Sequence, residues 1–179
     1  MTDAGIETAQ GSPFWRFSLG FYRQPGVADA CITLQDECGV DVNVLMFFLW
    51  FATQRKEVSP EQARAVWEQA ALWRDHVVAP LRSVRRKLKE GVPLVARDTA
   101  EFFRTRIKAV ELESERLEQE ALFAMIPSIK TTTAPSVEAA ARANVLAYEQ
   151  ALAVAFTPGP LEILFAALVS FARGGAGTT

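Results

Sequence analysis

Apolar residues recur along most of this chain at the three- and four-residue spacing of an amphipathic helix. No alternating strand pattern persists, and glycine and proline fall between the periodic segments rather than inside them. The pattern predicts an all-α fold: a single-domain bundle of about seven helices, one of them a long helix at roughly 97–125. Residues 1–11 are expected to be a disordered N-terminus, 12–173 the helical domain, and 174–179 a disordered tail.

Capping signals set several helix boundaries. Ser12 and Ser59 each precede a proline, which is typical of an N-cap followed by the first helical turn. Asp41 is expected to cap the helix that starts at residue 42, and this role accounts for the residue without further chemistry. Pro80 removes an amide and crowds the carbonyl of His76, so a kink or break is expected there.

The segment 42–55 is the most apolar part of the chain. Its middle, residues 44–51, is apolar on every side, which is typical of a helix at the centre of a bundle. Phe48 and Leu49 should therefore be almost fully buried. The four tryptophans and many phenylalanines are interpreted mainly as core, with an aromatic-lined ligand pocket as the alternative.

The long helix at 97–125 has two distinct sides. Phe103, Ile107, Val110 and Leu117 follow a heptad-like spacing that predicts an inward face. The opposite side is expected to be the solvent-facing one, and it carries the glutamates Glu111, Glu113, Glu115, Glu118 and Glu120. On the next helix, Asn144 interrupts an apolar stripe and is expected to hydrogen-bond between helices.

Basic residues concentrate at one place. Five lysines and arginines lie between residues 82 and 89, although the formal net charge is only −2 and the sequence pI is near 5.5. Four of them form one side of an amphipathic helix, which we call the basic face: Arg82, Arg85, Arg86 and Lys89. Such a face suits phosphate, RNA, anionic lipid or an acidic protein surface. The alternatives are a solvated face and internal pairing with the glutamates of the long helix.

Several function classes find no support in the sequence. His76 is the only histidine, which excludes sites built on a histidine pair, and no catalytic set, metal site or cofactor is expected. The N-terminal residues lack the pattern of a signal peptide, and the apolar runs are shorter than a membrane span. Cys31 and Cys38 are seven residues apart on a predicted helix, too far for a disulfide, so reduced thiols in a cytoplasmic protein are expected.

Three segments together carry a resemblance: 15–27, 31–45, which runs from Cys31 through Gly39-Val40-Asp41, and the basic 80–89. They resemble a proteobacterial family of conserved small proteins of unknown function, of the DUF2390 type. The resemblance implies a bacterial cytoplasmic setting and no known activity.

The expected function is therefore that of a non-enzymatic macromolecule-binding or regulatory protein. Its partner would be a protein or another anionic macromolecule at the basic face; peripheral membrane contact stays open, as does the oligomeric state. The alternative is a small apolar ligand-binding protein, or an enzyme, with an aromatic-lined interior pocket. Its pocket mouth would be formed by Tyr22, Arg23, Asp41 and Asn43.

Overall fold

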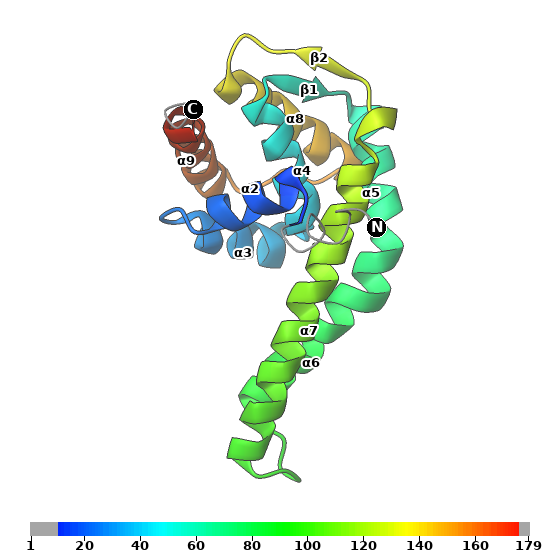
Figure 1. The fold of residues 1–179 in the computed structure, drawn as a ribbon, viewed down its shortest axis with the longest axis vertical. Helices are drawn as coiled ribbons and strands as arrows, with labels where there is room; N and C mark the ends of the chain where they lie inside the picture. The colour runs from blue at the N-terminus through cyan, green and yellow to red at the C-terminus, as the bar shows by residue number, and fades with distance from the viewer. Residues whose placement is uncertain (1–10, 176–179) are drawn as a thin grey trace, which may run out of the picture.

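The computed structural model describes residues 11–175, and these are mostly helical (Figure 1). The helices are α2 (Pro13–Tyr22), α3 (Val27–Cys38), α4 (Val42–Thr53), α5 (Pro60–Trp73), α6 (Ala79–Glu90), α7 (Arg97–Ala124), α8 (Val137–Leu152) and α9 (Pro158–Gly175). Because α5 continues into α6 without a loop, the described residues form seven long helical segments. This confirms the predicted all-α fold and the long helix.

Most of the residues expected to be disordered at the two chain ends lie outside the described part of the structure. These are residues 1–10 and 176–179. The last helix, α9, extends to Gly175, two residues past the expected end of the domain.

Helix α4 lies at the centre of the fold, in contact with α2, α3, α5, α7, α8 and α9. Phe48 and Leu49 are completely buried, as predicted. Phe47 packs against Phe14 of α2, and Phe48 packs edge-on against Tyr148 of α8, with ring centroids 5.1 and 5.3 Å apart. The helix starts where expected, because the Asp41 carboxylate accepts hydrogen bonds from the amides of the first turn. An apolar helix with no polar side has to be surrounded, and this determines where its neighbours lie.

Pro80 changes the helix but does not interrupt it. A π-helical turn, η1 (Arg74–Val78), joins α5 to α6, and Pro80 lies in the first turn of α6. The Ala79 amide donates to the Arg74 carbonyl, a five-residue step. The wider turn accommodates a residue that lacks an amide and would crowd a carbonyl in a regular helix. The predicted disturbance is thus present as a π turn just before the proline.

Two short strands were not predicted. β1 (Lys56–Val58) pairs antiparallel with β2 (Thr131–Thr133), which follows a 3₁₀ turn, η2 (Ile126–Ser128). Three residues are too few to show an alternating pattern. Asn144 of α8 holds this pair of strands to the core. Its amide donates to the Phe48 and Lys56 carbonyls, and its oxygen accepts from the Val58 amide. The cross-helix role predicted for Asn144 is confirmed.

A helical arm projects from this body. Figure 1 shows α6 and the N-terminal half of α7 running side by side away from the other helices, joined by a turn at 91–96. We call residues 79–110 the arm. No residue of α6 is buried, because one side of this helix packs on α7 and the rest faces solvent.

The side of α7 that faces inward differs from the prediction. Glu111, Ser114 and Glu118 are buried, whereas Phe103, Val110 and Leu117 are about half exposed. The expected outward position of Glu111 and Glu118 is therefore wrong. The physical reason is that both carboxyl groups find hydrogen-bond partners on neighbouring helices, described below.

We expect Phe48→Ala to lower the free energy of unfolding by about 2–5 kcal/mol, because a fully buried aromatic ring leaves a cavity at the centre of the fold. Urea unfolding followed by circular dichroism measures this. Leu146→Ala, at an exposed position of the adjacent α8, is the matched control and should cost less than about 0.5 kcal/mol. Equal losses in the two variants would contradict the central position of α4.

Candidate functional site

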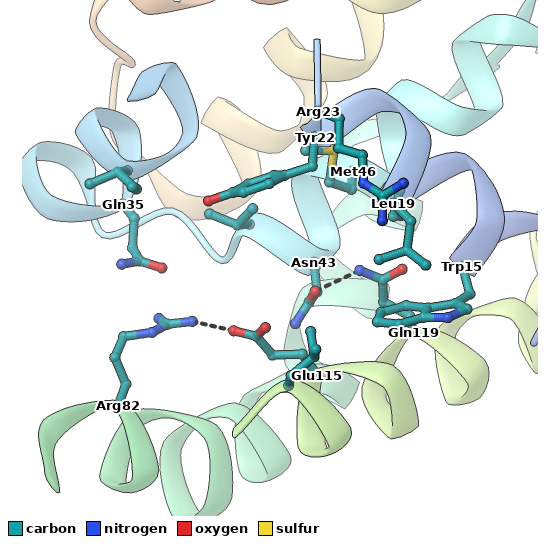
Figure 2. A pocket seen from close by; sticks show the side chains of 14 residues that line it. Trp15, Leu19, Tyr22, Arg23, Gln35, Asn43, Met46, Arg82, Glu115 and Gln119 are labelled. Carbon is teal, nitrogen blue, oxygen red and sulfur yellow. Dashed lines mark hydrogen bonds and ion pairs between the residues drawn. The ribbon is translucent and has the colours of Figure 1, made fainter. Parts of the chain in front are cut away.

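A cavity of about 230 Å³ lies between the body and the base of the arm (Figure 2). Helices α2, α3 and α4 line one side of it, and α6 and α7 line the other. Its apolar lining consists of Trp15, Leu19, Ile32, Val42, Met46 and Leu112. Its polar lining consists of Ser18, Tyr22, Arg23, Gln35, Asn43, Arg82, Glu115 and Gln119. The cavity therefore joins apolar surface with a concentrated set of polar groups.

Two buried amides form the inner wall of the cavity. The Gln119 side-chain amide donates to Asn43 Oδ1 over 2.8 Å, and the Asn43 amide donates to Glu118 Oε2, also over 2.8 Å. Because each amide is oriented by the next group in this chain of hydrogen bonds, Gln119 Oε1 is left without a partner. Ser18 of α2 also lines the cavity, and its hydroxyl is buried and has no hydrogen-bond partner.

A pair of carboxyl groups lies behind this wall. Glu118 and Asp41 are only 3% and 6% exposed, and Asp41 is near enough to affect the titration of Glu118. Burial, followed by the negative charge of Asp41, raises the pKa of Glu118 to about 9. This pKa keeps Glu118 protonated at neutral pH. Glu118 Oε1 and Asp41 Oδ2 are both buried and have no hydrogen-bond partner.

The remaining contacts of Asp41 fix it in place. Besides capping α4, it lies 3.7 Å from a guanidinium nitrogen of Arg74, which stacks over the Trp67 ring at 5.4 Å. The Asp41 amide donates to the Tyr148 hydroxyl over 3.2 Å. The Asp41 carboxylate thus faces one arginine and lies near a protonated Glu118, which reduces the cost of burying acidic groups here.

The basic face is largely paired within the fold. Arg82 binds Glu115 over 2.8 Å and Glu111 over 3.3 Å, and Arg85 also binds Glu111. Arg86, which is about half exposed, forms an ion pair with Asp36 of α3. Pairing with the glutamates of the long helix, one of the alternatives left open by the sequence, is thus the arrangement observed for Arg82 and Arg85, whereas Arg86 pairs with α3 instead. Lys89 is exposed near the end of α6.

The predicted pocket-mouth residues converge, with one exception. Tyr22 and Arg23 are exposed at the opening of the cavity, and Asn43 lies in its inner wall. Asp41 does not line the cavity; it lies behind Asn43, which it orients through the cap of α4. Arg82, predicted for the basic face, also lines the cavity, and Figure 2 shows it pointing toward Glu115 across the opening.

Sequence reasoning missed Ser18, Glu118 and Gln119. One signal was present: Glu111, Ser114 and Glu118 follow one another at steps of three and four residues, which places polar groups along a single stripe of α7. A polar stripe is ordinarily solvent-facing, so its burial becomes visible only once the partners Asn43, Arg82 and Arg85 are placed.

Three further observations limit what the described residues can do. Within residues 11–175, no group of three or more His, Cys, Asp or Glu side chains is arranged to hold a metal ion. Burial raises the pKa of the Cys31 thiol to about 12, so this free cysteine is a poor nucleophile. In the same part of the chain, no helix has the length and apolar character that crossing a membrane requires.

The chain matches a known protein family. The profile of a family described as "Protein of unknown function (DUF2390)" matches residues 13–122. The matched region begins with α2 and ends near the end of α7, so it contains every residue that lines the cavity. Comparisons with curated proteins and with solved structures found no match.

The raised pKa of Glu118 should appear in the pH dependence of stability. The folded protein holds this proton more tightly than the unfolded chain does, so the free energy of unfolding falls as pH rises from about 4.5 to about 9. Glu118→Gln keeps the hydrogen bonds and removes the titration. We expect it to match the unsubstituted protein near pH 4.5 and to become the more stable of the two above it, by at most about 1.4 kcal/mol per pH unit.

Urea titrations at several pH values measure this difference. Glu68→Gln, at an exposed position of α5, is the control and should leave the pH dependence unchanged. A stability difference between Glu118→Gln and the unsubstituted protein that stays constant from pH 5 to 9 would contradict the raised pKa of Glu118.

The ion pairs of the arm predict that its cations contribute unequally to the free energy of unfolding. Arg85→Gln weakens the neutralisation of the buried Glu111 and should cost about 1–3 kcal/mol, whereas Lys89→Gln should cost less than about 0.5 kcal/mol. A double-mutant cycle with Glu111→Gln, measured by urea unfolding, separates the pair from its surroundings. A coupling energy near zero would show that Arg85 and Glu111 act independently.

Proposed function

Since the chain belongs to the DUF2390 family, whose function is unknown, we propose from the site alone that this protein binds a small organic molecule in the cavity between α2, α3, α4, α6 and α7. The observation that carries the proposal is that two residues lining the cavity, Gln119 and Ser18, each have a buried polar atom without a hydrogen-bond partner, Gln119 Oε1 and Ser18 Oγ. A ligand with an apolar body and a hydrogen-bond donor matches this lining.

Energetics favour a ligand at these two atoms. A buried acceptor without a partner costs about 1–3 kcal/mol, and natural interiors seldom leave such groups unused. Gln119 cannot turn its oxygen away, because its amide nitrogen is held by Asn43 and Asn43 is held by Glu118. The acceptor is therefore fixed in position before a ligand arrives, which lowers the entropy cost of binding.

The shape of the cavity limits the size of the ligand. At roughly 30 Å³ for each water-sized group, 230 Å³ holds a molecule of about eight non-hydrogen groups. Trp15, Leu19 and Met46 provide the apolar contacts. An amide, amine or hydroxyl on that molecule would reach Gln119, and the exposed Tyr22 and Arg23 would lie at the entrance.

A binding role fits this geometry better than a catalytic one. The protonated Glu118 does not line the cavity, and Asn43 stands between it and any ligand. Arg82 and Glu115 do line it, but each is occupied by the other. The alternative of a macromolecule docked on the basic face has less support, because Arg82 and Arg85 are committed to Glu111 and Glu115.

Matched fragments test the proposal. Benzamide carries an N–H donor, and acetophenone is similar in size and shape but lacks one. We expect benzamide to shift the amide resonances of residues lining the cavity in NMR spectra and to bind more tightly than acetophenone, by about tenfold if one hydrogen bond to Gln119 or Ser18 is gained.

Variants locate the interaction. Ser18→Ala removes an unpartnered hydroxyl, so it should leave the fold stable while weakening the binding of donor-bearing fragments. Ser83→Ala, at an exposed position of α6, is the control and should change neither. If benzamide and acetophenone bind equally, or if their shifts map outside the cavity, the proposal fails.

A further inference from the structure

The far end of the arm exposes an unusual number of apolar side chains. Leu94, in the turn between α6 and α7, is 94% exposed, and Val92 and Val95 beside it are 42% and 44% exposed. On the first turns of α7, Phe102 is 69% and Phe103 is 47% exposed. Figure 1 shows this turn at the end of the molecule farthest from the body. We call residues 91–103 the tip.

The tip has a defined shape. The Val95 amide donates to the Val92 carbonyl over 3.2 Å, which closes a tight turn around Pro93. Gly91 ends α6 with a φ of 96°, a backbone conformation that other residues rarely adopt. Together these features hold Leu94 away from the rest of the chain, in contact with solvent.

The arm around the tip is strongly basic. Residues 85–108 contain eight lysines and arginines but only three acidic residues, Glu90, Asp98 and Glu101, in a chain whose net charge is −2. Three of the arginines are paired with carboxylates: Arg85 with Glu111, Arg86 with Asp36, and Arg104 with Glu101. The other five basic residues are all exposed: Lys87, Lys89, Arg97, Arg106 and Lys108.

We propose that the tip docks this protein on an anionic lipid bilayer, with Val92, Leu94 and Val95 entering the interface between headgroups and acyl chains. The exposed cations then lie at the level of the lipid phosphates. Peripheral proteins bind membranes by this combination of apolar insertion and attraction to anionic lipid, and lysine and arginine side chains extend toward the headgroups while their neighbours enter deeper.

The dimensions of the arm agree with this placement. At 1.5 Å per residue, Phe102 and Phe103 lie about 8–9 Å along α7 from its first residue, within the depth that interfacial apolar groups reach. Helix α6 has 12 residues and is about 18 Å long, so the body stays clear of the bilayer. The cavity entrance at Tyr22 and Arg23 belongs to the body and remains in water.

The chemistry of the tip favours lipid over other anionic partners. Nucleic acids are bound by cations together with aromatic rings that stack on bases. Phe102 and Phe103 are exposed rings, but the most exposed side chain of the tip, Leu94, and its neighbours Val92 and Val95 are aliphatic and offer neither a donor nor a stacking surface. In an anionic bilayer, an apolar layer lies directly beside a layer of negatively charged headgroups. The apolar layer can accept the aliphatic side chains of the tip, and the headgroups can pair with the cations around it.

Vesicle co-sedimentation tests the proposal with the full chain. Vesicles of phosphatidylcholine with about 30% phosphatidylglycerol should bind the protein at low ionic strength, and vesicles of pure phosphatidylcholine should bind it at least tenfold less. Added salt should release it, because attraction between exposed charges is screened.

Two sets of variants separate the parts of the interaction. Val92→Ser/Leu94→Ser/Val95→Ser should reduce binding to the anionic vesicles at least tenfold, and so should Lys87→Gln/Lys89→Gln/Arg106→Gln. All six positions are exposed, so thermal unfolding should change little in either variant. Leu72→Ser, at a 72% exposed position of α5 away from the tip, is the apolar control and should bind as the unsubstituted chain does.

Three outcomes would overturn the proposal. One is the absence of binding to the anionic vesicles. A second is loss of binding in the charge variant but not in the serine variant, which would show simple electrostatic adsorption without insertion. The third is salt-sensitive binding to a single-stranded RNA such as poly(U) that exceeds binding to the vesicles, which would assign the arm to nucleic acid instead.

Discussion

Burial of the α7 carboxyl groups is the constraint on which much of this structure depends. A buried carboxylate is costly unless hydrogen bonds and opposite charges surround it, so each one dictates what lies next to it. Glu111 requires Arg82 and Arg85, which draws α6 against α7. Glu118 requires a proton and the Asn43 amide, which places α7 across the start of α4. The polar stripe of α7 thereby positions both the arm and the inner wall of the cavity.

The same constraint accounts for the apolar residues left on the surface. An α-helix turns about 100° per residue, so the stripe of Glu111, Ser114 and Glu118 is rotated by roughly 70° from the set Phe103, Val110 and Leu117, and only one of the two can point directly inward. With the polar stripe inside, the heptad residues turn toward solvent. The partial exposure of Phe103, Val110 and Leu117 is thus a consequence of the buried polar stripe beside them.

Sequence pattern was sufficient for the features that depend on local chemistry. The caps at Ser12, Asp41 and Ser59 form as expected because each uses a side chain and an amide two or three residues apart. The central position of α4 followed from its apolar residues on every side. The cross-helix role of Asn144 was also foreseeable, because an amide inside an apolar stripe needs buried partners.

Features that depend on distant partners could not be predicted in the same way. The rotation of α7 was misjudged because glutamates on a long helix ordinarily face water, and the arginines that hold Glu111 inside lie about 26 to 29 residues away. The strands β1 and β2 are only three residues long and pair across a separation of more than 70 residues. Ser18 and Gln119 became candidates only when α2 and α7 were placed on opposite sides of one cavity.

Arg82 connects the two proposed sites. It belongs to α6, and so to the base of the arm, yet it lines the cavity, where it holds Glu115. The lining of the cavity comes from the body on one side and from α6 and α7 on the other, so a bound molecule would contact both. If binding in the cavity depends on how the arm packs on the body, and docking of the tip depends on the same packing, the two binding equilibria are coupled. Such coupling is reciprocal. Occupancy of the cavity and docking of the tip would in that case affect one another equally, through the position of a single helix pair.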